Sequence, residues 1–200
     1  MKLSRSREKT MEQSGTYDDM KGVIGSLISL WVGIERTVEK LDDAAPRQAG
    51  DESFPTSVSS RLDHWQRRVQ ADEGNRPFRA SLARRLRQQL REAQKIRNGI
   101  CHGLQGIAAA NREQPGRICW RINGIELSRT WDEMQAHFAW LSKVAFALEI
   151  LEEGDMSCFA RLHDSEENRE WWRAEYGIDL PEPEPWKRFV GKLPTLRGGA

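Results

Sequence analysis

Three side chains that could act together on a phosphodiester lie within a nine-residue segment, from Lys95 to Gly103. They are Arg97, Asn98 and His102. The guanidinium of an arginine keeps its proton and presents a planar set of donors that matches phosphate oxygens, and a histidine can give or take a proton near neutral pH. These residue types together suit the cleavage of a phosphodiester bond.

Cleavage of RNA without a metal ion needs three functions. A base removes the proton of the 2′-hydroxyl, an acid protonates the leaving 5′-oxygen, and hydrogen-bond donors stabilise the charged phosphorane between these steps. His102 suits both proton transfers and Arg97 suits the stabilisation of charge, while Asn98 could hold a phosphate oxygen or orient the histidine. No cluster has the spacing of metal ligands, so the sequence predicts neither a metal nor a cofactor.

The order of these residues, an arginine, a polar residue, three further residues and a histidine, resembles the signature of the HEPN superfamily (higher eukaryotes and prokaryotes nucleotide-binding). The resemblance covers residues 17–153. It implies a small helical bundle, often a metal-independent ribonuclease in stress, toxin–antitoxin or antiviral defence. It also implies that two subunits share a composite cleft and leave a 2′,3′-cyclic phosphate and a 5′-hydroxyl.

The same resemblance implies the partners, which are RNA, a second copy of the chain and an antitoxin or regulatory protein. Toxins of the superfamily that pair with nucleotidyltransferase antitoxins commonly carry a tyrosine two residues after the histidine, the position that is modified. This chain has Leu104 there, which puts neutralisation by that route in doubt.

The direction of the arginine is a geometric difficulty for this hypothesis. On a regular α-helix, residues five apart point about 140° away from each other, so Asn98 and His102 align whereas Arg97 points toward the apolar side. Three arrangements would bring Arg97 to the histidine. The backbone deviates at Gly99 and Gly103, the long arginine side chain wraps around the helix, or the arginine reaches across a dimer seam.

A structural role for the same side chains is the alternative. Arg97 would then pair with an acid such as Glu35 or Glu39, and His102 would help to satisfy carbonyl groups at a helix end. Three classes of function therefore stay open: a metal-independent endoribonuclease, a catalytically silent RNA-binding module, and a helical protein-interaction protein.

A stripe of basic residues leads along the same predicted helix toward the motif. Between Arg76 and Arg97 the only acid is Glu92, so this face is expected to carry a positive potential that binds RNA phosphates. The alternative is an ordinary solvated helix face. The basic stripe consists of Arg84, Arg87, Arg91 and Lys95.

Apolar residues at helical spacing predict an all-α fold, a four-helix up-and-down bundle of the HEPN-like kind. A first helix is expected from Tyr17 to about Asp42, and its glycines are expected to let another backbone approach closely (Gly22, Gly25 and Gly33). The other helices should begin at Thr56 or Ser57, at Pro77, and at the capping box Thr130-Trp131-Asp132-Glu133, the last of them running to about Glu153.

Asn123-Gly124 between two short β-prone runs predicts a small β-hairpin inserted before the fourth helix, after a loop that follows Gly103. The eight tryptophans are interpreted as core residues rather than base-stacking ones. Three regions are expected: a flexible N-terminus (1–16), the helical bundle (17–154), and a Trp/Pro-rich extension (155–200) with a short helix over 164–176. The last fifteen residues could dock on the bundle, on a second subunit or on RNA.

Charge and cysteine content favour a cytoplasmic protein. Charged residues make up 30% of the chain but nearly cancel, to a net charge of +1, so only local charge is informative about partners. The three cysteines are an odd number at irregular spacing and are interpreted as free thiols. Neither a leader peptide nor an apolar run long enough to cross a membrane is recognisable, so no membrane partner is expected.

Overall fold

The computed structural model describes residues 17–45, 57–111, 113–152 and 160–181. Several of the predictions lie outside these residues. They are the flexible N-terminus, the thiol of Cys158, and the chain from residue 182 onward with its prolines and aromatic residues.

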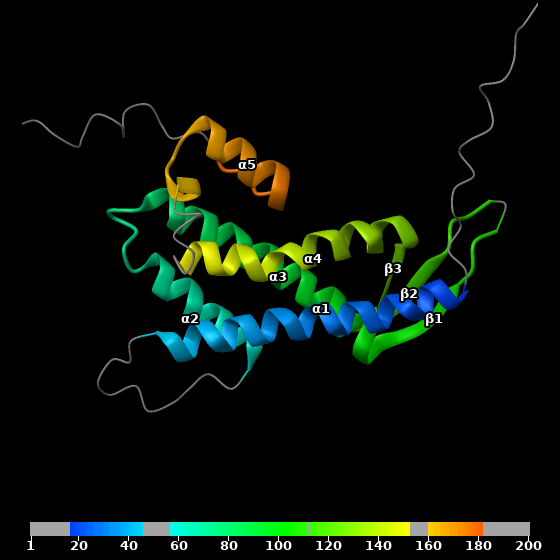
Figure 1. Cartoon of the computed structure of the whole chain (residues 1–200). Coiled ribbons are helices and arrows are strands. Elements are labelled where there is room, and N and C mark those ends of the chain that lie inside the picture. The colour runs from blue at the N-terminus through cyan, green and yellow to red at the C-terminus, as the bar shows by residue number, and fades with distance from the viewer. Residues whose placement is uncertain (1–16, 46–56, 112, 153–159, 182–200) are drawn as a thin grey trace, which may run out of the picture.

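The described chain is mostly helical, with five helices and one three-stranded antiparallel sheet at one end of them (Figure 1). A helical fold with a small β insertion was expected, but the sheet has three strands where a two-stranded hairpin was predicted. The elements are α1 (Tyr17–Ala44), α2 (Val58–Gln70), α3 (Pro77–Gly103), β1 (Leu104–Ala108), β2 (Arg117–Ile122), β3 (Ile125–Thr130), α4 (Trp131–Glu152) and α5 (Glu166–Tyr176).

The helices do not follow the expected up-and-down order. Lys40 near the end of α1 reaches Glu149 near the end of α4 at 3.2 Å, and Asp42 meets Arg68 near the end of α2 at 2.9 Å. Helices α1, α2 and α4 thus run in one direction and α3 runs against them (Figure 1). The prediction assumed short antiparallel connections. Residues 45–57, however, form a connection long enough to span the length of α2, which is about 20 Å at 1.5 Å per residue. Helix α2 can therefore run in the same direction as α1.

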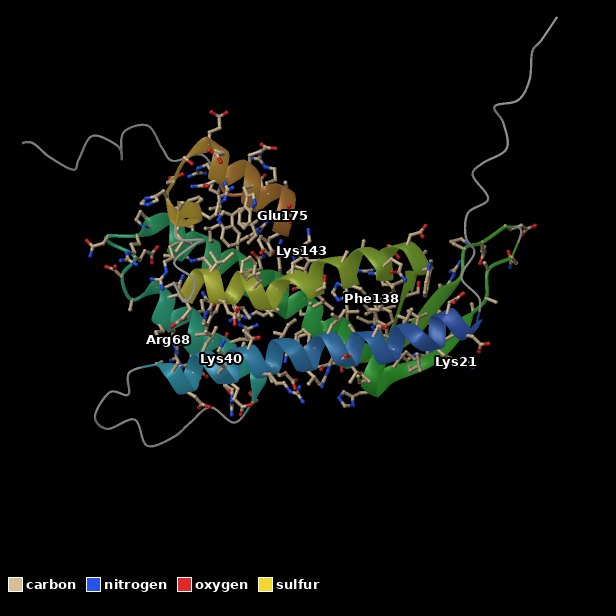
Figure 2. The ribbon with its side chains drawn as sticks, viewed as in Figure 1. Lys21, Lys40, Arg68, Phe138, Lys143 and Glu175 are labelled. Carbon is tan, nitrogen blue, oxygen red and sulfur yellow. The ribbon has the colours of Figure 1, made fainter. Side chains whose placement is uncertain are left out.

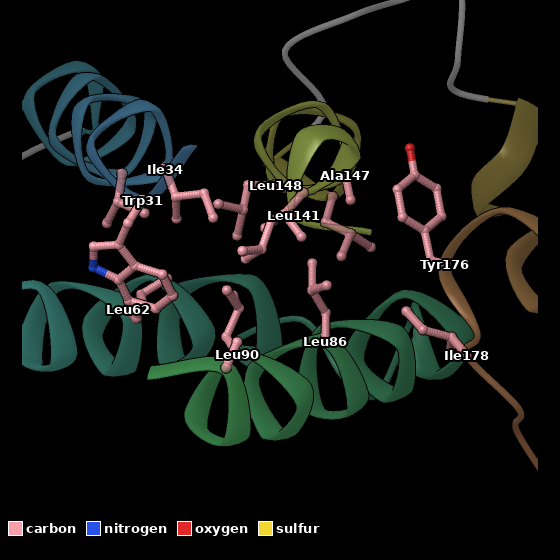
Figure 3. Packing of buried hydrophobic residues seen from close by; sticks show 14 of the residues in the cluster. Trp31, Ile34, Leu62, Leu86, Leu90, Leu141, Ala147, Leu148, Tyr176 and Ile178 are labelled. Carbon is pink, nitrogen blue, oxygen red and sulfur yellow. The ribbon is translucent and has the colours of Figure 1, made fainter. Parts of the chain in front are cut away.

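One apolar core joins α1, α3 and α4, and α2 and α5 close it on two sides (Figure 3). Trp31 and Ile34 of α1 face Leu148 of α4 and Leu90 of α3, all of them at most 1% exposed. Four tryptophans are likewise almost completely buried, which confirms the interpretation of these residues as core: Trp31, Trp65, Trp120 and Trp172.

The predicted hairpin and capping box are both present. Asn123 and Gly124 have φ angles of 50° and 79°, as a tight two-residue hairpin turn between β2 and β3 requires. The N–H of Thr130 donates to the Glu133 carboxylate at 2.7 Å, and the Glu133 N–H donates to the Thr130 hydroxyl at 3.3 Å. The prediction of a loop directly after Gly103 is wrong, because residues 104–108 form β1, which pairs with β2 through an irregular register.

Two glycines let β2 cross α3 at close range. A Cβ at Gly99 would collide with the indole of Trp120, and one at Gly103 would collide with the backbone carbonyl of Arg121. In contrast, no described atom lies within 4 Å of the Cβ position at Gly22, Gly25 or Gly33. The expected close approach at α1 is therefore not found in the described chain, and it occurs instead at the end of α3.

Helix α5 packs into the same core as the other helices. Trp172 and Tyr176 belong to the buried cluster, and the indole N–H of Trp140 donates to the Tyr176 carbonyl at 3.1 Å. At the surface, Lys143 of α4 pairs with Glu175 of α5 at 2.8 Å (Figure 2). Within the described residues, no helix has the length and apolar character that crossing a membrane requires.

Candidate functional site

Arg97 belongs to the C-terminal part of α3, and its side chain, which is 31% exposed, lies beside Glu35 of α1. Its Nη1 donates to the Asn98 side-chain oxygen at 2.9 Å, and its Nη2 lies 3.9 Å from a carboxylate oxygen of Glu35. Its Nε is buried and has no hydrogen-bond partner among the described residues. Much of the donor capacity of this guanidinium is thus unused.

The long side chain of Arg97 turns toward Asn98 and does not wrap around the helix to His102, as one of the three expected arrangements required. The backbone does not deviate either, because α3 stays helical through Gly103. The glycines at its end instead make room for β2. Arg97 and Asn98 are therefore in contact, as a shared phosphate site would need.

His102 lies apart from this pair. It is in the last turn of α3, exposed, and its ring makes no hydrogen bond to another described residue. Along a regular helix it sits about 7.5 Å and 140° away from Arg97. A single chain therefore brings together Arg97, Asn98 and Glu35, but leaves the imidazole to one side.

The basic stripe is not the continuous positive face that was predicted. Arg84 pairs with Glu73, Arg91 with Asp63 and Lys95 with Glu92, at 2.8 to 2.9 Å. Arg87 is 1% exposed and donates to Asp63 at 2.8 Å, so it faces α2 rather than solvent. The prediction counted acids on α3 alone, whereas α2 and the following turn supply Asp63 and Glu73.

Asp63 shows how this part of the stripe is compensated. Burial alone would raise the pKa of its carboxyl, but hydrogen bonds from Arg87 and Arg91 and their positive charges outweigh that effect and leave the pKa lowered. Asp63 therefore stays ionised, and its single negative charge is shared by the two arginines. Three of the four stripe residues remain on the surface, each paired with an acid, although Arg91 shares its acid with the buried Arg87.

The proposed structural partners of Arg97 are only partly as expected. Glu35 is indeed the nearest acid, but at 3.9 Å, the ion pair is looser than those of the basic stripe. Glu39 pairs instead with Arg61 of α2 at 3.1 Å. The expected role of His102 in satisfying helix-end carbonyls is not seen among the described residues.

A charged cluster that the sequence did not reveal ties three helices together. The Arg68 guanidinium donates to Glu152 of α4 at 2.7 Å and to the buried Asp42 of α1 at 2.9 Å (Figure 2). Burial lowers the pKa of Arg68, but the two carboxylates outweigh this and leave it raised. The partners are far apart in sequence, so no local signal could have identified them, and the cluster joins α1, α2 and α4.

The described chain has two free thiols. Cys101 is exposed and Cys119 half-buried, and both are free, as predicted. In the described part of the chain, no group of three or more His, Cys, Asp or Glu side chains is arranged to hold a metal ion. Comparison of the chain with protein-family models, with curated proteins and with solved structures gave no match.

Proposed function

We propose that this protein is a metal-independent endoribonuclease of the HEPN type, with Arg97, Asn98 and His102 as its site residues. The proposal rests mainly on the weak pairing of the Arg97 guanidinium. Its guanidinium is partly exposed and lies 3.9 Å from the carboxylate of Glu35, and its buried Nε has no partner among the described residues, while the surface cations of the basic stripe have acids within 2.9 Å. An arginine with spare donors beside an amide suits a phosphate.

The roles follow from the chemistry of each side chain. His102 takes the proton of the 2′-hydroxyl, whose oxygen attacks phosphorus, and the imidazolium so formed gives a proton to the leaving 5′-oxygen as its bond to phosphorus breaks. Arg97 donates to the equatorial oxygens of the phosphorane, where charge accumulates, and Asn98 positions one of them. Glu35 keeps the guanidinium oriented toward Asn98.

The proposal includes a homodimer, because one helix separates the two groups. About 7.5 Å of rise and 140° of rotation lie between Arg97 and His102, so the arginine of one subunit would act with the histidine of its partner. A twofold axis would create two such sites. Light scattering should then give about twice the chain mass of 23.0 kDa.

The test is cleavage of structured and single-stranded RNA by the purified protein in the presence of EDTA. Arg97→Ala and His102→Ala should each lose most activity while their circular dichroism stays helical. Arg85→Ala is the matched control, since this exposed α3 arginine donates to Gln88 and to no other residue of the described chain. Unchanged cleavage by His102→Ala would refute the assignment.

Co-expression of the two inactive chains tests the shared cleft. In a mixed dimer of Arg97→Ala and His102→Ala, one composite site has lost both groups but the other retains both. Some activity should therefore return. Failure to recover any activity, with mixed dimers demonstrated by differential tags, would place both groups in one subunit.

A helical interaction protein is the second candidate, and the contact between Arg97 and Glu35 is the observation that favours it. If that pair is only structural, Glu35→Gln and Arg97→Ala should lower the melting temperature by similar amounts, and the wild-type protein should cleave no RNA. A silent RNA-binding module would differ by showing salt-dependent RNA affinity without cleavage.

A further inference from the structure

A groove of about 530 Å³ lies between the last third of α3 and the β2–β3 hairpin. Ile96 of α3 forms one wall, Ile125 and Leu127 of β3 form the other, and Trp120 of β2 lies between them. Its volume is within the roughly 300 to 1,000 Å³ of typical small-molecule sites. The groove belongs to neither the Arg97 site nor the basic stripe, apart from Lys95 at its edge.

Two apolar side chains of this groove are unusually exposed for their type. Ile125 is 64% exposed and Leu127 is 42% exposed, although Leu127 faces its strand neighbour Trp120 on the α3 side of the sheet. Single exposed apolar residues need no explanation, but apolar residues gathered along a concave surface indicate a binding site. The walls therefore suit an aliphatic group.

Two cations border the groove, and they differ in how they are balanced. Lys95 pairs with Glu92 at 2.8 Å, so its charge is already compensated. Arg129 donates only to the carbonyl of the adjacent Ser128, at 3.2 Å, and pairs with no carboxylate of the described chain. The groove thus carries one uncompensated positive charge.

Two buried ring nitrogens lack hydrogen-bond partners among the described residues, and one of them belongs to a groove residue. The indole Nε1 of Trp120, a groove residue only 1% exposed, has no hydrogen-bond acceptor among the described residues. Nε2 of His137 on α4 is likewise buried and unpartnered. Burial, and to a smaller extent the positive charge of Arg129, lowers the pKa of His137.

We propose that this groove binds a medium-chain aliphatic carboxylate, with the chain along Ile96, Ile125 and Leu127 and the head group on Arg129. The apolar walls match the chain, and the uncompensated guanidinium matches a carboxylate, which it can hold through two parallel hydrogen bonds. Each methylene buried tightens binding up to about fourfold.

The test uses the full chain with octanoate, 1-octanol and acetate as probes, followed by calorimetry and by amide NMR shifts. Octanoate should bind, with shifts at residues 92–96 and 125–129. Octanol lacks the charge and acetate lacks the chain, so each should bind at least about tenfold more weakly.

Two variants separate the parts of the site. Arg129→Gln should weaken octanoate binding about tenfold or more and leave octanol unchanged, whereas Leu127→Asn should weaken both. Arg121→Gln is the matched control, because this exposed β2 arginine pairs with Glu126 rather than with a groove residue, and it should bind octanoate like the wild type.

Equal octanoate affinity in Arg129→Gln and wild type would overturn the proposal, as would no binding of octanoate to the folded protein. Groove resonances that shift with protein concentration instead would mean that a second copy covers this surface, which would also overturn it. The inference is independent of the ribonuclease proposal, because His102→Ala should still bind octanoate.

Discussion

The close crossing of β2 over α3 leads to a prediction about Gly103. Any side chain at this position would meet the backbone carbonyl of Arg121. A backbone carbonyl in a paired strand cannot rotate away, so Gly103→Ala must displace β2 or distort the last turn of α3. Because His102 is the preceding residue, the same crossing also holds the proposed catalytic histidine in place.

The magnitude follows from two opposing effects. Overpacking costs about 1 to 3 kcal/mol, while replacing a helical glycine by alanine gains up to about 1 kcal/mol and less at a helix end. Gly103→Ala should therefore lower the free energy of unfolding by about 1 to 2 kcal/mol. Gly25→Ala is the matched control: it lies inside α1 with no described atom within 4 Å of its Cβ position, and should gain up to about 1 kcal/mol.

Urea unfolding followed by circular dichroism measures both variants against the wild type. The expected result is a change of opposite sign at the two glycines, with similar urea dependence. A Gly103→Ala protein as stable as the wild type would refute the packing argument. A destabilised Gly25→Ala protein would show that this face of α1 is covered in solution.

Two further predictions concern buried polar groups. Arg87→Ala should lower the free energy of unfolding by about 3 kcal/mol, which is at the low end for a broken buried ion pair, because the Asp63 side chain is 41% exposed and keeps Arg91 as a partner. Arg91→Ala should lower it by less than about 1 kcal/mol. Equal losses for the two variants in urea unfolding would contradict this difference between a buried and an exposed arginine. Burial and Arg129 lower the pKa of His137 below its ordinary 6.5, so below about pH 6.5 the unfolded chain takes up a proton that the folded chain does not. The melting temperature should then fall as the pH drops from about 6.5 through the folded-state pKa. His137→Gln should flatten that part of the profile, and an unchanged slope would exclude His137 as its source.

Local signals in the sequence identified most of the elements. The apolar spacing gave the positions of α1 to α4, and the short helix expected over 164–176 is α5. The Asn-Gly pair and the Thr130–Glu133 capping box were identified because each depends on residues no more than three positions apart. Strand β1 was missed, since its five residues include Gly106 and show no clear alternation of apolar side chains, and its pairing with β2 decides its conformation.

The site residues Arg97, Asn98 and His102 stay a prediction from sequence spacing. The structure does confirm Glu35 as a neighbour of the arginine, which the sequence had named as a possible partner. The compensation of the basic stripe could not be found in this way, because Asp63 and Glu73 lie on other segments. The groove beside Arg129 was also missed, since β3 and α3 are joined only by the fold.

The sequence by itself determined which segments are helical and where the hairpin turns. These properties depend on neighbouring residues, whose contacts follow from helix and strand geometry. Tertiary structure alone decided that α1, α2 and α4 run in one direction, that Arg87 is buried against Asp63, and that Arg97 keeps unused donors. Each of these depends on which distant segments meet, and an ion pair forms with whatever acid the packing brings within reach.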